Sequence, residues 1–584
     1  MKISLCMIVG NVEEYILRCL ASFAPIADEI CVVRAIGSQT PDRTMELAQG
    51  FCLARDIRLK VAHYPNKAFH LDWPHVDDFA AARNMAFEMA EGDYCFWCDS
   101  DDVLDDKSED RNPKTEGNPK SEIRVPNTVE LIRGHAEKGE YLAYVFPYNI
   151  FGRGVSVPRE RMIKRGSGKW RYPVHECFVF AENPVHGMED QRVVVTHLPH
   201  LNKSGSSERN LRILKSIPEK DLSAGLLYHL QGELALSGDI TGSIKVAERA
   251  LRAPDLGRPE RYELWLNLAQ LSTHPRAKES MLQAAYAADP RRREALGLLA
   301  CHSMDYGASD LALAYGRQMV ATLPPASPDW NDRAAVYGWL GEEIYSQVLR
   351  VNGYEAEAEA LRRMMLQKAG GARIALVHAT RGRPQQAAMC RKVWLDLAER
   401  PAAIEHLFVM DADDQESVAL KRMHHMVVPA GGGCVRAWNE GARATEAPVI
   451  VQLSDDWVPV PRWDSLILER LGDVKQQKVL AVSDGVRGDR LLCMAICTRD
   501  YLIRDGYLFH PDFTGVFSDN WFTDCAYRRG AVIEARDIQF VHEHPVRTGK
   551  PLDRTYADQN APERYEAGER VYRKLCERQL QSET

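Results

Sequence analysis

The chain has 584 residues, of which 45% are hydrophobic and 27% charged, and its formal net charge is −8. A chain of this length is too long for one hydrophobic core and should divide into about three or four domains. The acidic balance disfavours broad electrostatic binding to nucleic acid or to an anionic membrane, although it is compatible with a local basic groove. No run of about 18 apolar residues occurs, so we expect no membrane span.

The fourteen cysteines are scattered, and most lie on apolar segments. This pattern is typical of reduced core thiols and predicts a cytoplasmic protein rather than a disulfide framework. Cys95 and Cys98 have the spacing of half a zinc site, but no second pair accompanies them. Their places on a predicted strand also direct the two side chains to opposite faces, so we interpret them as core residues.

Residues 1–203 alternate between predicted strands and helices. This alternation indicates an α/β domain with a mostly parallel sheet covered by helices on both faces. The expected strands include 3–9, 29–33 and 94–97, and the expected helices are 13–22, 40–49 and 80–89.

The strand at 94–97 runs directly into Asp99, Asp101 and Asp102. Carboxylates at the end of a buried strand are costly unless they hold a cation or accept hydrogen bonds. That end of an open α/β sheet is also where ligands bind. Residues 105–122 are rich in Asp, Lys, Asn and Pro, and we expect a surface loop there, with a lid over the cluster as one interpretation.

The strand pattern disappears between residues 204 and 370. Pro218, Pro254, Pro290 and Pro324 recur at spacings of 36, 36 and 34 residues, each after an amphipathic helix. The segment from Gly238 to Pro254 resembles the second half of a tetratricopeptide repeat, whose period is about 34 residues. The segment therefore predicts helical hairpin repeats, which either bind a peptide on a concave surface or act as a rigid spacer.

The α/β pattern returns over residues 371–560, and residues 561–584 are expected to form a charged amphipathic helix that packs on this domain. The third expected strand here ends at Asp455 and Asp456, as the strand at 94–97 ends at Asp99. The expected strands are 373–379, 405–410, 449–453 and 537–541, and the expected helices include 385–397 and one that carries 439–444.

Several short motifs follow one another in the first segment. They are Ser4–Val9 with Asn11 and Glu13-Glu14, Ala27–Val33, Gly37-Ser38, Asp42–Thr44, Asp77–Asn84, Gly92-Asp93, the Asp99 cluster, Val174–Glu176 and His197. No single motif is decisive, but the ordered set resembles the family 2 glycosyltransferases. The resemblance implies the GT-A fold and transfer of a sugar from a nucleotide-diphospho-sugar donor.

The resemblance also implies roles for individual residues. Asp99 would contact the ribose, and Asp101 a divalent cation, Mn²⁺ or Mg²⁺, that offsets the diphosphate charge. Glu176 is the expected base for inverting transfer, with His175 as the alternate. Asp102 either joins the site or caps the segment that follows it. The other implied residues are Asp78, Arg83 and Asn84 at the nucleotide and His197 at the metal.

One departure from the family pattern follows the second strand. The family places an aspartate there against the base of the nucleotide, whereas this chain has Arg34 and Ala35. Either the nucleotide is recognised differently, or the donor is unusual, or donor binding is lost in this domain.

Residues 373 to about 545 resemble the same family more remotely, with acids also at Asp411, Asp413 and Asp414 after the second strand. The resemblance implies a second GT-A domain with its own donor site. Its implied residues are Arg381, Arg383, Asp411 and Asp455 at the nucleotide-sugar, Asp456 and His542 at the metal, and Asp519 as base.

The sequence thus predicts a tandem enzyme with domains at 1–203, 204–370 and 371–560. At least one GT-A domain would transfer sugar to a hydroxyl of a polymer, with protein or glycan favoured over DNA. Two alternatives stay open: a helical-repeat scaffold whose first GT-A domain is inactive, and a nucleotidyltransferase. The second usually needs a glycine-rich loop with a basic residue near the first strand, and Gly10-Asn11-Val12 is a poor substitute. Association into a homo-oligomer also stays open.

Overall fold

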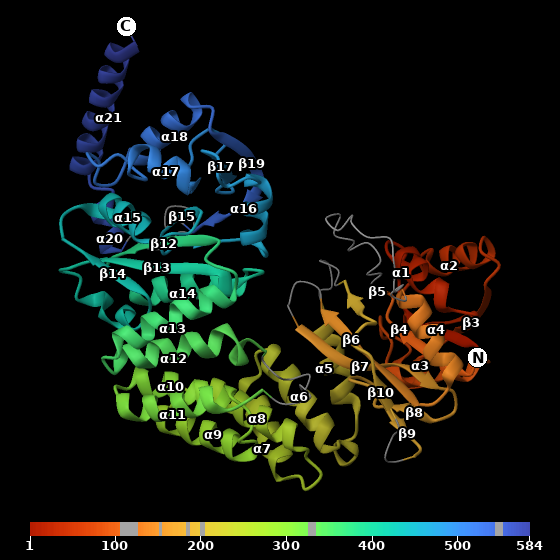
Figure 1. The fold of residues 1–584 in the computed structure, drawn as a ribbon. Helices are drawn as coiled ribbons and strands as arrows, with labels where there is room; N and C mark the ends of the chain where they lie inside the picture. The colour runs from red at the N-terminus through yellow and green to blue at the C-terminus, as the bar shows by residue number, and fades with distance from the viewer. Residues whose placement is uncertain are drawn as a thin grey trace, which may run out of the picture. The chain divides into compact units, whose positions relative to one another are not determined.

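The computed structural model describes residues 1–104, 127–150, 155–182, 187–198, 205–324, 334–543 and 553–583. The chain forms two compact units (Figure 1), the first Met1–Pro290 with Pro324–Asp332 and the second Arg291–Leu323 with Arg333–Thr584. The loop expected at 105–122 lies outside the described residues, and the predicted domain boundaries stay a prediction.

The first unit begins as a mixed α/β domain and continues into helices. Its elements are β1 Ile3–Val9, α1 Ile16–Phe23, β2 Glu29–Arg34, α2 Thr44–Leu53, β3 Arg58–His63, α3 Phe79–Met89, β4 Tyr94–Cys98, β5 Asp102–Leu104, α4 Thr128–Lys138, β6 Ala143–Ile150, β7 Val155–Lys164, β8 Gly168–Arg171, β9 Cys177–Phe180, β10 Gly187–Glu189, β11 Val195–His197, α5 Ser206–Ser216, α6 Ala224–Leu236, α7 Ile240–Arg252, α8 Arg258–Leu271 and α9 Pro275–Ala288.

The main sheet of this unit has the order β3-β2-β1-β4-β7-β6-β11-β5, with β10 paired to β6. The first four strands are parallel, whereas β7 runs antiparallel to both β4 and β6. Both faces are covered, since Leu5 packs in the cluster that contains Ile16 of α1 and Cys6 in the cluster that contains Ala82 of α3. The sheet is therefore more mixed than the predicted one, although its parallel part lies where the sequence places it.

Helix α2 begins at Thr44, four residues after the expected start at 40. The Asp42 carboxylate accepts from the backbone N–H of Thr44 at 2.9 Å and from that of Glu13 at 3.0 Å. These bonds tie the segment before α2 to the chain after β1, so it cannot extend the helix.

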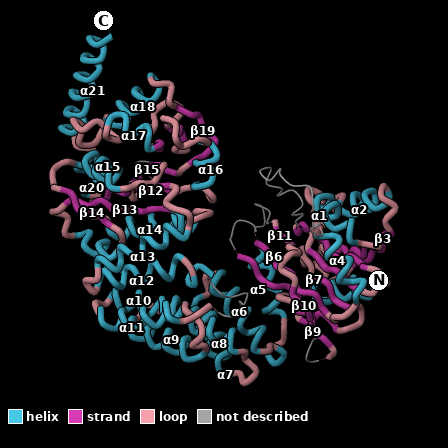
Figure 2. Tube along the Cα trace, in the orientation of Figure 1, coloured by secondary structure: helices cyan, strands magenta, loops and turns pink. Residues whose placement is uncertain are grey.

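Helices follow one another from α5 through α13 (Figure 2). In the first unit α6 and α7 form one helical pair and α8 and α9 another, with Pro254 and Pro290 two residues after the ends of α7 and α9. The expected helical hairpins are present, because each proline ends a helix that packs on its predecessor.

The second unit begins with two further helical pairs and continues into a second sheet. Its elements are α10 Glu294–Asp305, α11 Ser309–Ala321, α12 Trp339–Val351, α13 Glu355–Lys368, β12 Ile374–Thr380, α14 Pro384–Asp396, β13 Ile404–Asp411, β14 His425–Val428, α15 Gly433–Ala444, β15 Val449–Leu453, β16 Trp457–Val458, α16 Trp463–Leu471, β17 Val479–Ser483, β18 Ile496–Thr498, α17 Arg499–Asp505, α18 Ser518–Arg528, β19 Val532–Gln539, β20 Val541–His542, α20 Arg554–Gln559 and α21 Pro562–Glu583.

The second sheet has the order β14-β13-β12-β15-β18-β17-β19. Its first four strands are parallel and β18 is antiparallel to β15. In both sheets, the first four neighbouring strands are the third, second, first and fourth along the sequence and are parallel, and the fifth neighbour is antiparallel. Leu376 packs in the cluster of Trp394 of α14, and Val377 in that of Val435 of α15, so helices cover opposite faces (Figure 1).

The C-terminal helix α21 packs on the second unit, as predicted. Leu575 is buried in the core cluster that includes Trp521 and Phe522 of α18. The Tyr572 hydroxyl also donates to the Asp524 carboxylate of α18.

All fourteen cysteines are free thiols. Among the described residues, no helix is both long enough and apolar enough to cross a bilayer.

Helix α15 depends on a glycine where it crosses the sheet. A Cβ at Gly441 would lie 2.5 Å from Cγ1 of Val377 and 2.7 Å from Cγ2 of Val409. Gly441→Ala should therefore overpack the core and destabilise this domain by about 1–3 kcal/mol, measured by hydrogen exchange at the amides of β12 and β13.

The matched control is Gly134→Ala in α4, where a Cβ meets nothing within 4 Å. There alanine should stabilise the helix by about 0.5–1 kcal/mol. Equal and small effects of the two substitutions would contradict the packing described for α15.

Candidate active site

A cavity of about 900 Å³ opens at the carboxyl ends of β1 and β4 in the first unit. One wall carries Arg83, Asp99 and Asp101, and the opposite wall carries Arg209 of α5 and His229 of α6. Pockets of this size hold a cofactor-sized ligand. The helical segment thus contributes directly to a cavity that the sequence placed in the α/β domain alone.

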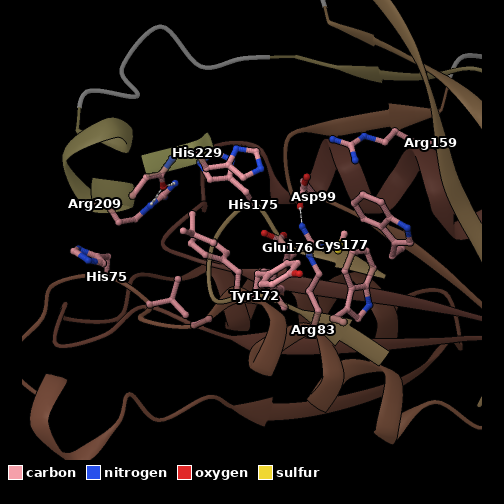
Figure 3. Close-up of a pocket in the computed structure, with 18 of the residues that line it drawn as sticks. His75, Arg83, Asp99, Arg159, Tyr172, His175, Glu176, Cys177, Arg209 and His229 are labelled. Carbon is pink, nitrogen blue, oxygen red and sulfur yellow. Dashed lines mark hydrogen bonds and ion pairs between the residues drawn. The ribbon is translucent and has the colours of Figure 1, made fainter. Parts of the chain in front are cut away.

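Arg83 of α3 connects two predicted site residues (Figure 3). Its Nη2 donates to Asp99 Oδ1 at 2.7 Å and its Nε to Glu176 Oε1 at 2.8 Å. The guanidinium lies between the Trp97 and Trp170 rings, 4.7 and 5.2 Å from their centroids. Burial by these rings strengthens both ion pairs and fixes the positions of the two carboxylates.

Neighbouring arginines stabilise the negative charge of Asp99. Burial acts to raise the pKa of Asp99, but the Arg83 and Arg161 guanidiniums outweigh it and keep this pKa well below its usual range. Asp99 is therefore a carboxylate across the physiological pH range and can only accept hydrogen bonds.

Asp102 is fully buried and paired with an equally buried arginine. Its Oδ2 accepts from Arg161 Nη1 at 3.1 Å and from the Asp99 backbone N–H at 3.0 Å, while Oδ1 accepts from the Tyr148 hydroxyl at 3.0 Å. The guanidinium carbon of Arg161 also lies 3.9 Å from the Trp97 ring centroid. Both readings of Asp102 thus have support, since it stabilises the turn after β4 and also lies beside the other acids.

Three side chains in this cavity can share one cation. Oxygens of Asp101 and Asp102 and a nitrogen of His197 lie within 4.8 Å of one another, and no other such group of three occurs among the described residues. His197 Nδ1 is 3.3 Å from Asp102 Oδ1 and 3.5 Å from Asp101 Oδ1. Two carboxylates and an imidazole suit Mn²⁺ or Mg²⁺, so these residues fit the predicted metal.

His175, predicted on the acceptor side, lies where the α/β domain meets the helices. His175 has a backbone φ of +54°, and its ring stacks on that of His229 with centroids 4.0 Å apart (Figure 3). Its Nε2 lies 3.3 Å from Glu233 Oε1 on α6. A non-glycine residue with positive φ costs conformational energy and is enriched at functional sites.

Two predicted nucleotide-binding residues have other contacts. Asp78 caps α3 by accepting from the Ala81 backbone N–H at 2.9 Å, and Asn84 bonds both backbone groups of Trp170, at 2.9 and 3.0 Å. Neither residue lines the 900 Å³ cavity. Where the family carries an aspartate after β2, Ala35 and Ile36 line the cavity instead.

A second cavity, of about 500 Å³, lies at the carboxyl ends of β12 and β15. It brings together every site residue predicted for the second domain. These are Arg381, Arg383, Asp411, Asp455, Asp456, Asp519 and His542.

Basic groups neutralise the acids of this cavity. Asp455 contacts His378 Nε2 at 2.9 Å, and Arg381 Nη1 donates to Asp411 at 2.8 Å and to Asp413 at 2.6 Å. Arg383 Nη2 donates to Asp553, just before α20, at 2.5 Å. The residues expected at the nucleotide are thus paired with one another and with the C-terminal part of the chain.

Asp456 is bound on one oxygen only. His542 Nε2 lies 3.1 Å from its Oδ2, which also accepts from the Tyr556 hydroxyl, while Oδ1 is buried and has no hydrogen-bond partner in the described chain. Burial acts to raise the pKa of Asp456, but the hydrogen bonds from His542 and Tyr556 keep it below its usual range. A buried, ionised and unshared carboxylate oxygen is suited to a cation.

Asp519, at the start of α18, has the opposite electrostatic environment. Its burial raises its pKa above the usual value. A carboxylate that binds protons more readily suits the role of a general base.

Four contributors were missed by the sequence interpretation: Arg161, Tyr148, His229 and Glu233. Arg161 lies within strand β7 beside apolar residues. A charged residue in such a strand is a sequence signal for a buried ion pair. His229 and Glu233 lie on a helix whose contact with His175 no local pattern indicates.

The N-terminal part of this site lies in a segment that matches a known protein family. Residues 4–109 match the family model described as Glycosyl transferase family 2. The matched part contains Arg83 and the Asp99 cluster, so the predicted glycosyltransferase domain at the N-terminus is confirmed. The N-terminal domain therefore resembles the family 2 glycosyltransferases over these residues.

The relatives also include helical-repeat proteins. A TPR repeat-containing protein of Synechococcus elongatus is 26% identical over 351 residues, 55% of this chain and 76% of that protein. The crystal structure of S. aureus TarS matches at 15% identity and a TM-score of 0.25, over 50% of this chain and 53% of its own. A crystal structure of MamA matches at 15% identity and a TM-score of 0.24, over 28% of this chain and 84% of its own. The chain thus spans about half of TarS, and at these TM-scores neither structure bears on its activity.

The Arg161–Asp102 pair yields a stability prediction. Arg161→Met removes the guanidinium and leaves a buried carboxylate without its counter-charge, which should cost about 3–5 kcal/mol of unfolding free energy. Urea denaturation measures this loss.

Arg159→Met, two residues away on β7, is the control. Arg159 is only half-buried, so its substitution should change stability by less than about 0.5 kcal/mol. If the two variants were equally stable, the pair would not stabilise the strand end.

Proposed function

We propose that the N-terminal domain is a metal-dependent, inverting transferase that moves a sugar from a nucleotide-diphospho-sugar to a hydroxyl group. The single observation that carries this proposal is the group of Asp101, Asp102 and His197 beside an ionised Asp99. A divalent cation held there would offset the charge of the donor diphosphate and of the departing nucleoside diphosphate.

The residues around the cavity would have different roles in such a transfer. Asp99, held by Arg83, accepts a hydrogen bond from the ribose, and Trp97 and Trp170 exclude water from this pair. On the acceptor side, Glu176 and His175 are the groups available to take the hydroxyl proton. As the acceptor oxygen bonds to the anomeric carbon, the bond from that carbon to the diphosphate breaks.

We infer that the acceptor is a polymer, with protein or glycan favoured over DNA. Helices α5 and α6 line the cavity and continue into further helical pairs, which offer an extended surface beyond the reacting hydroxyl. The net charge of −8 disfavours a nucleic-acid acceptor.

The second domain is proposed to be a further GT-A transferase. Its sheet repeats the strand order of the first, and its seven predicted residues line one cavity. Asp456 and His542 would hold the metal and Asp519 would act as base. The alternative of a nucleotidyltransferase would need a glycine-rich loop that binds phosphate. No observation on the described residues supports such a loop.

Donor turnover tests the first site. The purified full chain with Mn²⁺ should hydrolyse at least one UDP-, GDP- or TDP-sugar, and Asp101→Asn should lower that rate by about 100-fold or more, because it removes a charged ligand. The control Glu88→Gln, an exposed carboxylate on α3, should leave the rate unchanged. If no donor in the panel were either turned over or bound, the proposal of transferase activity would be wrong for both domains.

Asp456→Asn tests the second site in the same assay. It should abolish turnover of one donor while the Asp101-dependent activity persists, because each substitution removes a metal ligand from a different cavity. Asp500→Asn, exposed on α17, is the control. If no donor depends on Asp456, the second domain has no transferase activity.

A further inference from the structure

The ring of His175 is held by the helical segment. It stacks on His229 with an interplanar angle of 4°, and its Nε2 faces Glu233 Oε1 at 3.3 Å. Both partners lie on α6, outside the residues matched by the family model. The strained backbone of His175, with φ at +54°, is thus stabilised by side chains of another structural segment.

The environment of Glu233 favours its role as a hydrogen-bond acceptor. It is 6% exposed, and it also accepts from Asn210 Nδ2 at 2.9 Å and from the Ser207 hydroxyl. Burial acts to raise the pKa of Glu233, but the bonds from His175, Ser207 and Asn210 lower it below its usual value. Because an ionised carboxylate only accepts, the proton of a neutral His175 must lie on Nε2, and Nδ1 keeps the free electron pair.

Two other titratable or charged side chains, His229 and Arg209, lie near this pair. His229 has its pKa lowered to about 3, first by burial and then by His175, so it stays neutral beneath the stacked ring. Arg209 of α5 lies near Glu233 and Glu176, and its described hydrogen bonds go to Asn210. A neutral aromatic ring against His175 tolerates the positive charge that the ring gains on protonation.

Glu176, in contrast, is already bound. Its Oε1 accepts from the buried Arg83 at 2.8 Å, and Arg83 also holds Asp99. A proton transferred to Glu176 would break a buried ion pair next to the donor site, whereas a proton transferred to His175 would create a new pair with Glu233.

We infer that His175 is the base of the N-terminal transferase and that Glu233, from helix α6, is the positioning residue that fixes its tautomer. The inference rests on the proposed function and deepens it. The acceptor O–H bond breaks as its proton moves to His175 Nδ1, and the oxygen bonds to the anomeric carbon. The bond between that carbon and the diphosphate breaks, and the nucleoside diphosphate leaves with the electron pair. The first helical pair is then part of the catalytic unit.

Glu233→Gln in the full chain tests this inference, with donor turnover measured between pH 5 and 9 in Mn²⁺. The expected result is a fall in kcat of about 10²–10⁴-fold with the KM for the donor unchanged. A fall confined to kcat distinguishes a lost positioning contact from a general loss of structure, which would also weaken donor binding. Glu248→Gln, exposed on α7, is the matched control with unchanged kinetics.

A double-variant cycle separates catalysis from folding. His175→Asn should lower kcat as far as Glu233→Gln does, and the double variant should fall no further, because the two residues act as a unit. If Glu233→Gln unfolds, Asn210→Ala replaces it and should lower kcat by a smaller amount, because it removes a bond that holds Glu233 in place.

Two outcomes are distinguishable. An active wild-type chain with an unaltered kcat in Glu233→Gln would overturn the inference and leave the proposed function standing. A wild-type chain without donor turnover would overturn the proposed function and the inference with it.

Discussion

The cost of burying carboxylates at the end of β4 governs the first site. Asp99 and Asp102 remain charged there because Arg83 and Arg161 lie against them, shielded by Trp97. In a medium of low dielectric constant such pairs are strong only if every charge has a partner. The arginines thus leave a cluster of fixed acids at a strand end, where Asp101, Asp102 and His197 lie close enough together to hold one cation.

The two cavities meet this constraint differently. In the first, arginines on α3 and β7 pair with the acids and leave Asp101 close to His197. In the second, histidines contact Asp455 and Asp456, and the arginines are paired with acids at the end of β13 and before α20. The same order of the first five strands therefore carries two different arrangements of charge.

The sequence predicted the strands and the strand-end acids well. The apolar runs 3–9 and 449–453 match β1 and β15, because strands buried on both faces are continuous in sequence. Strand β7 was missed, since the charged run Arg159–Arg161 hides its alternation. Arg161 and its partner Asp102 are 59 residues apart, and no local pattern predicts such a pair. Asn84 was expected at the nucleotide, but its amide bonds the backbone of β8, a contact that only the tertiary fold defines.

Metal binding in solution tests the central claim most directly, that the acids after β4 form a cation site for a diphosphate. Electron paramagnetic resonance of free Mn²⁺, titrated with the full chain, measures this binding with and without UDP, GDP or TDP. The account predicts bound Mn²⁺ whose affinity rises with at least one of these nucleotides and falls in Asp101→Asn. Free Mn²⁺ that stays unchanged by the protein, with every nucleotide, would contradict it.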